Sequence, residues 1–529
     1  MKNIFVIIIA TLTSFTSLFY YLMISGQLSE LTGEETIAQS LSLGLYLTGM
    51  ALGSGLCDKM LSIMYDRNHK WKLLIQAEMF VATIGSSLFL IGPLCLAFYL
   101  VYVNQYLFSP YDIPLPLIFQ IYVPMIFGLG FFSGIQLPIL LHLNHEEESQ
   151  ILFLNYLGAL FAGVLLNVFL AMGQSTQELL IFVLLLNFFT LFLLMILQRK
   201  FALSKYFTMP LLSLLLILNW LPKIEKAELL SYYLGFKIQS LKQLGDWSRV
   251  LGQYANLERH VSPYQKIDIV TEPPQIESYF HGNVSLFLNR KPQFDLYSHK
   301  TYHQSMVAGS INLNNQIPKK ILVLGAGDGI LAHELLKHKE VESILMVELD
   351  PAMIEISRRH RVLSSLNGGV LELEDPRLKI VINDAISFLR TDKEKYDGIY
   401  IDFPYPYSNE LKKLYSLEFY QMISAHTNND GFFIFDFPLE SEIQESRHNK
   451  MTGCLLNTLK KAGFAHPFGF GPYSSFVFVS KSDIQRSFNY STLPEKLDLS
   501  SSLNLVSLEH VLKRERKGNC YYSLFYGRD

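Results

Sequence analysis

Residues 321–330 read ILVLGAGDGI, and residues 344–350 read ILMVELD. Each stretch contains an aliphatic run that predicts a buried strand, and the intervening LAHELLKHK has the spacing of an amphipathic helix. The turn after the first run contains three glycines, Gly325, Gly327 and Gly329. This pattern predicts a β-loop-α-β unit in which the glycine turn lets the backbone approach a ligand. Glu348, at the end of the second strand, can then accept hydrogen bonds from the hydroxyls of a ribose.

Asp328, inside the glycine turn, indicates the charge of the ligand. A carboxylate here repels a pyrophosphate, because two negative charges at close range raise the free energy of binding. A cationic nucleoside such as a sulfonium is therefore the better candidate.

Strands continue to alternate with helices after this unit. Further strand-like runs cover 379–384, 396–402, 431–437 and 474–480, and two shorter runs precede the unit at 264–270 and 284–289. The alternation predicts a doubly wound, largely parallel sheet, and the two early runs predict a small antiparallel sheet before it. Acids occur at the predicted strand ends: Asp328, Glu348, Asp384 and Asp402. Because ligands bind at the carboxyl ends of parallel strands, these four acids predict one site.

The N-terminal part of the chain has a different composition. Apolar stretches long enough to cross a bilayer, roughly 20 residues each, cover 4–24, 38–57, 72–102, 116–142, 151–172 and 178–197. We therefore expect a multi-pass membrane domain. Ionisable residues are nearly absent from these stretches, apart from Glu78 near one end of its stretch, and this scarcity argues against a transporter.

The loops predict the orientation of the membrane domain. Lys2 and the loops that follow the second and sixth stretches are basic, whereas the loop at 25–37 contains three glutamates and no base. The positive-inside rule places the N-terminus and both basic loops in the cytoplasm. Two alternatives stay open for the short apolar segment 207–221. A spanning segment would put the soluble domain outside, and a re-entrant or interfacial segment would keep it in the cytoplasm, which we expect for an inner-membrane protein that uses a nucleoside.

Charge and cysteine content limit the remaining functions. The net charge is −3, which leaves no electrostatic footprint for nucleic acid. The four cysteines are scattered and predict neither a disulfide framework nor a zinc site.

An ordered series of motifs runs through the C-terminal part. It comprises YQKI (264–267), LFLN and QF (286–289 and 293–294), YH (302–303), LGAGDG (324–329), VELDPAM (347–353), LNGG (366–369), DPRLKIVINDA (375–385), YDGIYIDFPYP (396–406) and KLYSLEFY (413–420). The series resembles the spermidine synthase (polyamine aminopropyltransferase) family, and most closely its membrane-spanning bacterial branch. That resemblance implies an N-terminal α-helical multi-pass membrane domain. It also implies a C-terminal α/β Rossmann-like (class I methyltransferase-like) domain preceded by a small antiparallel β-sheet.

The resemblance divides the chain into five parts. They are a transmembrane domain (1–221), a linker with amphipathic helices (222–260), a small β subdomain (261–310), a Rossmann-like aminopropyltransferase domain (311–485) and a C-terminal extension (486–529). The implied reaction moves an aminopropyl group from decarboxylated S-adenosylmethionine, a co-substrate, to putrescine or a related amine, and releases 5′-methylthioadenosine. No metal and no permanently bound cofactor are implied. The expected partners are the amine, the nucleoside and the lipid bilayer. Soluble relatives in the family form oligomers, so a homo-oligomer is also considered for this chain.

Residue roles follow from the same resemblance. Asp402 matches the catalytic aspartate of the family. Residues on the donor side are Gln293, Asp328, Glu348, Asp384 and Ala385. Residues on the acceptor side are Tyr302, His303, Tyr405, Asp436 and Tyr473, of which Tyr302 and His303 also approach the aminopropyl arm. Within the donor set, Asp328 faces the charged end, Glu348 the ribose, and Asp384 with Ala385 the adenine edge.

The chain departs from the family at the acceptor side. Ser298 and His299 stand where the family has an acidic pair, and Tyr405 replaces a second aspartate. Phe435, Asp436 and Phe437 replace a strand end that contains glutamine. These changes predict a retained nucleoside site and an altered, weakened or absent diamine site. Two compensating contacts stay open: an acid from Asp436 and a cation–π contact from Tyr405. Two alternatives therefore stand beside the aminopropyltransferase: another S-adenosylmethionine-dependent transferase, and a membrane protein that senses or moves a nucleoside or polyamine without catalysis.

Overall fold

The computed structural model describes the following residues: 2–32, 35–63, 67–102, 115–172, 176–198, 226, 229–230, 233, 256–271, 283–296, 298–373, 375–405, 409–437, 445–464, 467–471, 476–481, 521 and 523. The chain divides into two compact units, Met1–Pro273 with Leu288–Lys291, and Pro274–Phe287 with Pro292–Asp529. The segment 207–221 and the predicted C-terminal extension, apart from residues 521 and 523, lie outside the described residues.

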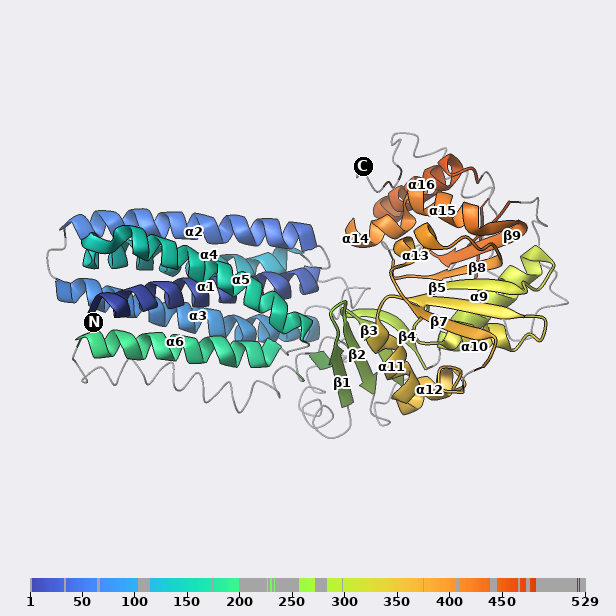
Figure 1. The fold of residues 1–529 in the computed structure, drawn as a ribbon, viewed down its shortest axis with the longest axis horizontal. Helices are drawn as coiled ribbons and strands as arrows, with labels where there is room; N and C mark the ends of the chain where they lie inside the picture. Colours follow the sequence, from blue (N-terminus) through green and yellow to red (C-terminus); the bar gives the residue numbers. More distant parts are fainter. Residues whose placement is uncertain are drawn as a thin grey trace. The chain divides into compact units, whose positions relative to one another are not determined.

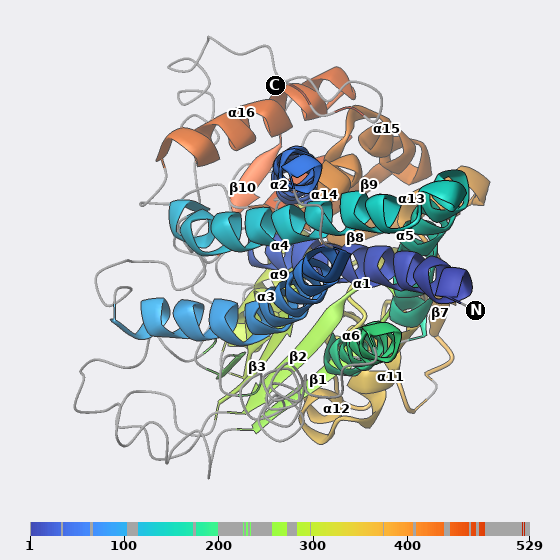
Figure 2. The same ribbon diagram turned by 90° about the vertical axis from the view of Figure 1, so that its left-hand side faces the viewer.

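The first unit consists mainly of long apolar helices. They are α1 (Lys2–Thr32), α2 (Glu35–Ile63), α3 (Arg67–Tyr102), α4 (Leu115–Leu143), α5 (Glu148–Ala171) and α6 (Thr176–Gln198). Each coincides with one of the predicted apolar stretches, and the helices lie alongside one another (Figures 1 and 2). Within the described residues, five of them are long and apolar enough to cross a membrane; α3 is not among the five.

Glycines allow the closest helix pairs to approach. A Cβ on Gly49 of α2 would lie 2.3 Å from the Phe127 carbonyl oxygen of α4, and one on Gly134 of α4 would lie 2.2 Å from the Met50 oxygen of α2. Gly158 of α5 approaches the Thr11 oxygen of α1 in the same way, at 2.2 Å. These contacts place backbone against backbone, which is how small residues pack apolar helices together.

A small four-stranded sheet follows the helices. Its strands are β1 (Asn256–Val261), β2 (Lys266–Thr271), β3 (Val284–Leu288) and β4 (Lys291–Asp295), in that order, and β1 pairs antiparallel with β2. The predicted antiparallel sheet is therefore confirmed. It begins earlier than predicted, because β1 occupies the end of the segment 222–260 that the sequence assigned to a linker. The alternation in NLERHV is weak, but Arg259 forms an ion pair with the buried Asp268 at 2.6 Å and fixes β1 on β2.

The large sheet of the second unit has seven strands. In sequence order they are β5 (Lys320–Gly325), β6 (Ser343–Glu348), β7 (Leu378–Ile382), β8 (Tyr396–Asp402), β9 (Thr427–Asp436), β10 (Phe468–Phe470) and β11 (Phe476–Ser480). The spatial order is β10-β11-β9-β8-β5-β6-β7. Strands β5 to β9 run parallel, and β11 and β10 add an antiparallel edge. This arrangement confirms the doubly wound, largely parallel sheet, and only the short β10 was missed.

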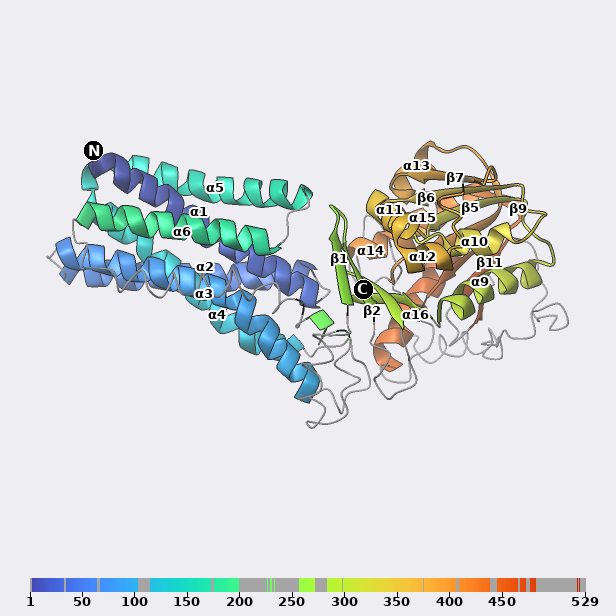
Figure 3. The same ribbon diagram turned by 90° about the horizontal axis from the view of Figure 1, so that it is seen from below.

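Helices cover both faces of this sheet (Figures 1 and 3). They are α9 (Ser298–Asn314), α10 (Ile330–Leu336), α11 (Pro351–Arg359), α12 (Arg361–Leu366), α13 (Ala385–Thr391), α14 (Asn409–Lys412), α15 (Leu417–His426) and α16 (Glu445–Lys461). Alternate residues of β5 serve the two faces, as a pleated strand requires. Ile321 and Val323 join a core cluster with residues of α9 and α10, and Leu322 and Leu324 join another with residues of α13, α15 and α16.

One cysteine differs from expectation. Cys454 of α16 is disulfide-bonded, although the scattered spacing of the cysteines predicted no disulfide. Cys57 of α2 is a free, buried thiol.

Candidate active site

The glycine turn lies between the end of β5 and the start of α10. Gly325 and Gly329 have φ values of +84° and +77°, which side-chain-bearing residues rarely adopt. Gly325 also lies against β8, because a Cβ there would be 2.3 Å from the Asp402 carbonyl oxygen. Asp328 is buried, and its Oδ1 accepts a hydrogen bond of 2.8 Å from the Ile330 backbone N–H. The turn is thus held close to β8, and the acid that the sequence placed inside it is buried.

Asn367, which the sequence did not identify as a site residue, also binds the glycine turn. Its Nδ2 donates to the Asp328 carbonyl oxygen at 2.9 Å and to the Ser357 carbonyl oxygen at 3.2 Å. The side chain is fully buried. The signal that could have identified it is the LNGG motif, since Gly368 and Gly369 both take positive φ values directly after it.

Glu348 ends β6 beside the glycine turn. Its Oε1 accepts a hydrogen bond of 2.9 Å from the Asp350 N–H, and a Cβ on Gly327 would lie 2.7 Å from its Oε2. The side chain is 9% exposed. Burial raises the pKa of this carboxyl to about 7, against the lowering effect of the backbone hydrogen bond from Asp350. Near neutral pH, hydrogen-bond donors that contact the carboxylate therefore favour its ionised form, whereas burial without such donors favours the neutral form.

Asp384 and Ala385 follow β7, the neighbouring strand. Asp384 caps α13, since its Oδ1 accepts a hydrogen bond of 2.9 Å from the Ser387 N–H. Ala385 is buried at the start of that helix. The Asn383 N–H donates to the Glu348 carbonyl oxygen at 2.9 Å, so the chain before Asp384 is joined to the end of β6. These two residues therefore lie at the edge of the sheet where Glu348 lies.

Asp402 ends β8 and meets a histidine from α9. His303 Nε2 lies 3.9 Å from Asp402 Oδ2, and the Asp402 side chain is 18% exposed. His303 Nδ1 lies 2.8 Å from the His299 carbonyl oxygen, which can only accept, so Nδ1 carries a proton and Nε2 faces the aspartate. Burial raises the pKa of Asp402 to about 6; the nearby His303 opposes this shift, and the negative charge of Asp328 adds to it.

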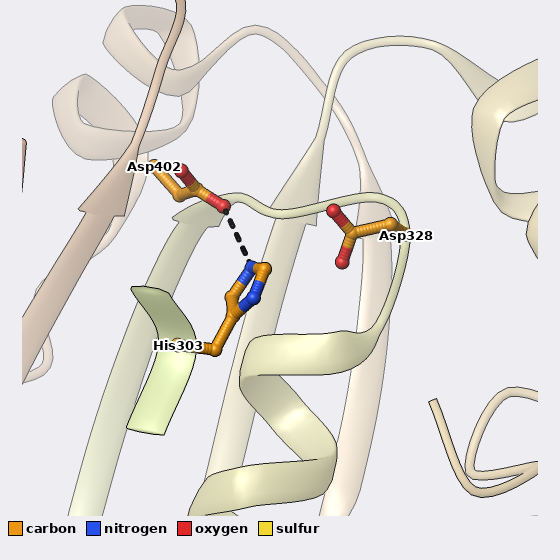
Figure 4. Close-up of side chains that lie close together, drawn as sticks. All are labelled: His303, Asp328 and Asp402. Atoms are coloured by element: carbon orange, nitrogen blue, oxygen red, sulfur yellow. Dashed lines mark ion pairs between the residues drawn. The ribbon is translucent and has the colours of Figure 1, made fainter. Parts of the chain in front are cut away.

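Three side chains from separate elements converge here. Figure 4 shows His303 between Asp402 and Asp328, all three pointing toward one another. One ligand atom from each lies within 4.8 Å of the others. Two carboxylates and an imidazole at this spacing can bind a positive charge, either a metal ion or an ammonium group.

A second acid lies beside Asp402. Asp436, at the end of β9, is 7% exposed, and the hydroxyls of Tyr302 and Tyr405 hydrogen-bond to it. The Tyr302 hydroxyl also lies 3.1 Å from Asp402 Oδ1, so its single proton is shared between the two carboxylates. Burial first, and then the charge of Asp402, raise the pKa of Asp436 well above its ordinary value. Within the described residues, Asp436 Oδ1 is buried and accepts no hydrogen bond. The two aspartates therefore differ, with Asp402 the readier to ionise.

The structure thus brings together most of the site residues that the sequence predicted. Those that lie at one edge of the sheet are Tyr302, His303, Asp328, Glu348, Asp384, Ala385, Asp402, Tyr405 and Asp436. Gln293 instead lies exposed on β4. Tyr473 lies outside the described residues. The roles of all these residues remain predictions.

Known proteins show similarity over both parts of the chain. Residues 300–461 match the family described as the spermine/spermidine synthase domain. The polyamine aminopropyltransferase of Oceanobacillus iheyensis is 28% identical over an alignment of 428 residues that covers 76% of this chain and 71% of that protein. That of Leptospira interrogans is 28% identical over 415 residues, covering 77% and 74%. The crystal structure of spermidine synthase from Thermotoga maritima is 24% identical, covers 49% of this chain and 84% of its own, and superposes with a TM-score of 0.36.

Proposed function

The chain belongs to the spermine/spermidine synthase family, and on that premise we propose that it transfers an aminopropyl group from decarboxylated S-adenosylmethionine to an amine. One observation carries the proposal: a partly buried Asp402 faces Asp328 and His303 at the carboxyl end of the sheet. Putrescine or a related amine is the proposed acceptor, and 5′-methylthioadenosine is the proposed nucleoside product.

The donor fits the glycine turn and its acids. Glu348 supplies two carboxylate oxygens for the ribose hydroxyls, and Gly327 leaves room beside them for the sugar. Asp384 and Ala385 lie one strand further along and take the adenine edge. Asp328 takes the positively charged end. A donor that has lost its carboxylate suits this arrangement, because a carboxylate beside Asp328 would be repelled. The same consideration disfavours S-adenosylmethionine itself.

The reaction requires a free amine. Alkyl ammonium groups resemble lysine, with a pKa near ~10.4, so the acceptor arrives protonated at neutral pH. Asp402 binds the ammonium and accepts its proton, and the nitrogen lone pair attacks the propyl carbon bonded to the sulfonium. A C–N bond forms as the C–S bond breaks, and the bonding electron pair remains on sulfur as a neutral thioether. The positive charge passes to the new secondary ammonium, so atoms and charge balance.

Asp436 is proposed to hold the acceptor in place of the acids that this chain lacks. Its Oδ1 is buried without a hydrogen-bond donor among the described residues, and Asp402 lies beside it. A second N–H of the incoming ammonium can satisfy that oxygen. An ammonium also favours ionisation of both aspartates, since an opposite charge within a few ångströms lowers a carboxyl pKa. The three N–H groups of the ammonium and the pair of acids are therefore complementary.

The ligand of the Asp402 cluster is proposed to be this ammonium rather than a metal ion. Three ligand atoms, one of them an imidazole nitrogen, are few for Mg²⁺, which prefers near-octahedral oxygen coordination. In the family reaction the amine attacks a carbon bonded to a sulfonium, and the leaving group is a neutral thioether that departs without Lewis-acid help.

The helical unit is proposed to place the enzyme in the inner membrane, with the transferase domain in the cytoplasm. Five helices have the required length and hydropathy. The side chains of Phe153, Tyr156 and Leu160 on α5 are 64%, 69% and 61% exposed. Large apolar side chains exposed on one helix are costly in water and suit contact with lipid.

Calorimetry of the full-length protein in detergent tests the proposed function. 5′-Methylthioadenosine is titrated into the protein alone and in the presence of saturating putrescine. The proposal predicts nucleoside binding whose affinity changes when putrescine is present, because both ligands occupy neighbouring parts of one site. Nucleoside binding that is indifferent to putrescine contradicts a diamine acceptor, and absence of nucleoside binding contradicts the transferase.

A further inference from the structure

Glu78 of α3 is fully buried within the helical unit. Asn187 Nδ2 of α6 donates to its Oε1 at 2.6 Å, and Gln136 Nε2 of α4 donates to its Oε2 at 2.6 Å. The sequence placed Glu78 near one end of an apolar stretch and gave it no role. In the structure Glu78 lies in the first third of α3 and meets Asn187 at the middle of α6.

Both hydrogen-bond donors to Glu78 are neutral. Among the described residues, no lysine, arginine or histidine forms an ion pair with this carboxylate. Two amides satisfy some lone pairs of the ion but supply no positive charge. A buried charge without an opposite charge is costly, and in apolar helices such a residue commonly marks a binding site.

Two buried oxygen atoms beside Glu78 have no hydrogen-bond partner within the described residues. Asn187 Oδ1 belongs to the same amide group that donates to Glu78, so it lies next to the carboxylate. The Tyr20 hydroxyl of α1 is the other. Tyr20 packs on the Glu78 face of α3, since a Cβ on Gly85, two turns further along from Glu78, would lie 2.5 Å from the Tyr20 Cγ. Both side chains are at most 1% exposed.

We propose that Glu78, Asn187 and Tyr20 form a binding site for a protonated primary amine inside the helical unit, distinct from the candidate active site. A primary ammonium carries one positive charge and three N–H donors, and the three side chains offer one negative charge and three oxygen acceptors. One ligand thus compensates the charge of Glu78 and satisfies both orphan oxygens. The inference does not depend on the transfer reaction.

A metal ion fits these residues less well. Sodium and calcium ions are coordinated by several oxygens, whereas two amide N–H groups already occupy the carboxylate of Glu78 and repel a metal ion. A proton alone would neutralise Glu78 but would leave the Tyr20 and Asn187 oxygens unsatisfied. The amine is the one ligand among these that satisfies every group.

Equilibrium binding of radiolabelled putrescine to the full-length protein in lipid nanodiscs tests the site. The wild type should show two classes of saturable site per chain, one in each unit. Glu78→Gln keeps the shape of the side chain and removes its charge, so it should abolish one class or weaken it by at least about tenfold, as loss of a charged hydrogen bond implies. Its formation of 5′-methylthioadenosine by the active site should not change.

Glu178→Gln is the matched control, because Glu178 is an exposed acid in the first turn of α6, the helix that carries Asn187. It should keep both classes of site. Tyr20→Phe keeps the ring against Gly85 and removes one acceptor, so it should weaken the same class about twofold to tenfold. This milder variant decides the matter where Glu78→Gln fails to fold.

Competition identifies the ligand. Butylammonium has three N–H donors and should displace putrescine from the Glu78 class, whereas tetramethylammonium, which has none, should not. Displacement by tetramethylammonium or by sodium at the same concentration overturns the proposal. A folded Glu78→Gln protein that keeps every class of site seen in the wild type also overturns it, whereas a single wild-type class that disappears in Glu78→Gln contradicts only diamine binding at the active site.

Discussion

Replacement of Asp402, the proposed general base, tests the chemistry of the candidate active site most sharply. Asp402→Asn preserves size, and its carbonyl oxygen can still accept the 3.1 Å hydrogen bond from Tyr302. The amide cannot accept a proton from the acceptor amine or carry the charge that faces His303 at 3.9 Å. Loss of a general base typically costs about 10²- to 10⁴-fold, or roughly 3–5 kcal/mol of transition-state stabilisation. We therefore expect kcat/KM for the amine to fall by at least about 100-fold.

The assay follows 5′-methylthioadenosine by chromatography under initial-rate conditions. Nucleoside affinity should stay within about threefold of the wild type, because Glu348 and not Asp402 contacts the ribose in the proposed complex. Glu394→Gln is the matched control: this acid follows α13, is 64% exposed at its side chain and pairs with Lys320, so its loss should leave kcat/KM unchanged. A folded Asp402→Asn protein that retains a third or more of the wild-type kcat/KM refutes the assigned base.

Further expectations concern pH and the neighbouring residues. Because Asp402 has a pKa raised to about 6 and must be ionised to act, kcat/KM in the wild type should decline as the pH falls through about 6, and a flat profile from pH 5 to 8 contradicts its role. Burial raises the pKa of Glu348 from 4.5 to about 7 in the folded state, and ribose hydroxyls favour its ionised form. Nucleoside binding should therefore release a proton, and its affinity should increase as the pH rises through 7. Calorimetry in buffers of different ionisation enthalpy measures the proton release, and Glu348→Gln should remove both effects. Asp436→Asn should raise KM for the amine about tenfold or more with little change in nucleoside affinity, and an unchanged KM would exclude it from the acceptor site. Gly327→Ala should fold normally but weaken nucleoside binding, because the new Cβ displaces the Glu348 carboxylate. Gly325→Ala should lower the melting temperature, because its Cβ would lie 2.3 Å from a backbone oxygen and residue 325 has a positive φ. Equal melting temperatures for the two variants would contradict this difference.

The parts of the fold that the sequence predicts best are those with strong periodic signals. Aliphatic runs followed by a glycine turn or an acid identified β5, β6, β7 and β8, and the long apolar stretches identified all six helices. β1 was not predicted because NLERHV alternates weakly, and the ion pair between Arg259 and the buried Asp268 joins two strands across the ladder, which no local pattern shows. β10 escaped because three residues are too few for a periodic signal.

The candidate site divides in the same way. Residues within one motif, such as Asp328 in the glycine turn, follow directly from the local pattern. The contact of His303 with Asp402 joins α9 to β8, and the hydrogen bonds of Tyr302 and Tyr405 to Asp436 join three elements. No local pattern contains such distances, because they depend on the register of the whole sheet.

The hydrogen bonds around Glu78 show most clearly what a local sequence pattern does not predict. In the sequence, Glu78 is an isolated acid near one end of an apolar stretch. Its partners, Gln136 and Asn187, come from helices that are 58 and 109 residues away along the chain. Only the packing of α3, α4 and α6 reveals that polar residues of three apolar helices meet at one point.

Product analysis of the purified full-length protein tests aminopropyl transfer most directly. The protein is incubated with putrescine and either decarboxylated S-adenosylmethionine or S-adenosylmethionine, and nucleoside and amine products are identified by mass spectrometry. We predict 5′-methylthioadenosine and an equal amount of aminopropylated amine from the decarboxylated donor, and neither from S-adenosylmethionine. S-adenosylhomocysteine from the second donor, or no product from either donor in a protein that binds the nucleoside, would contradict the proposed transfer.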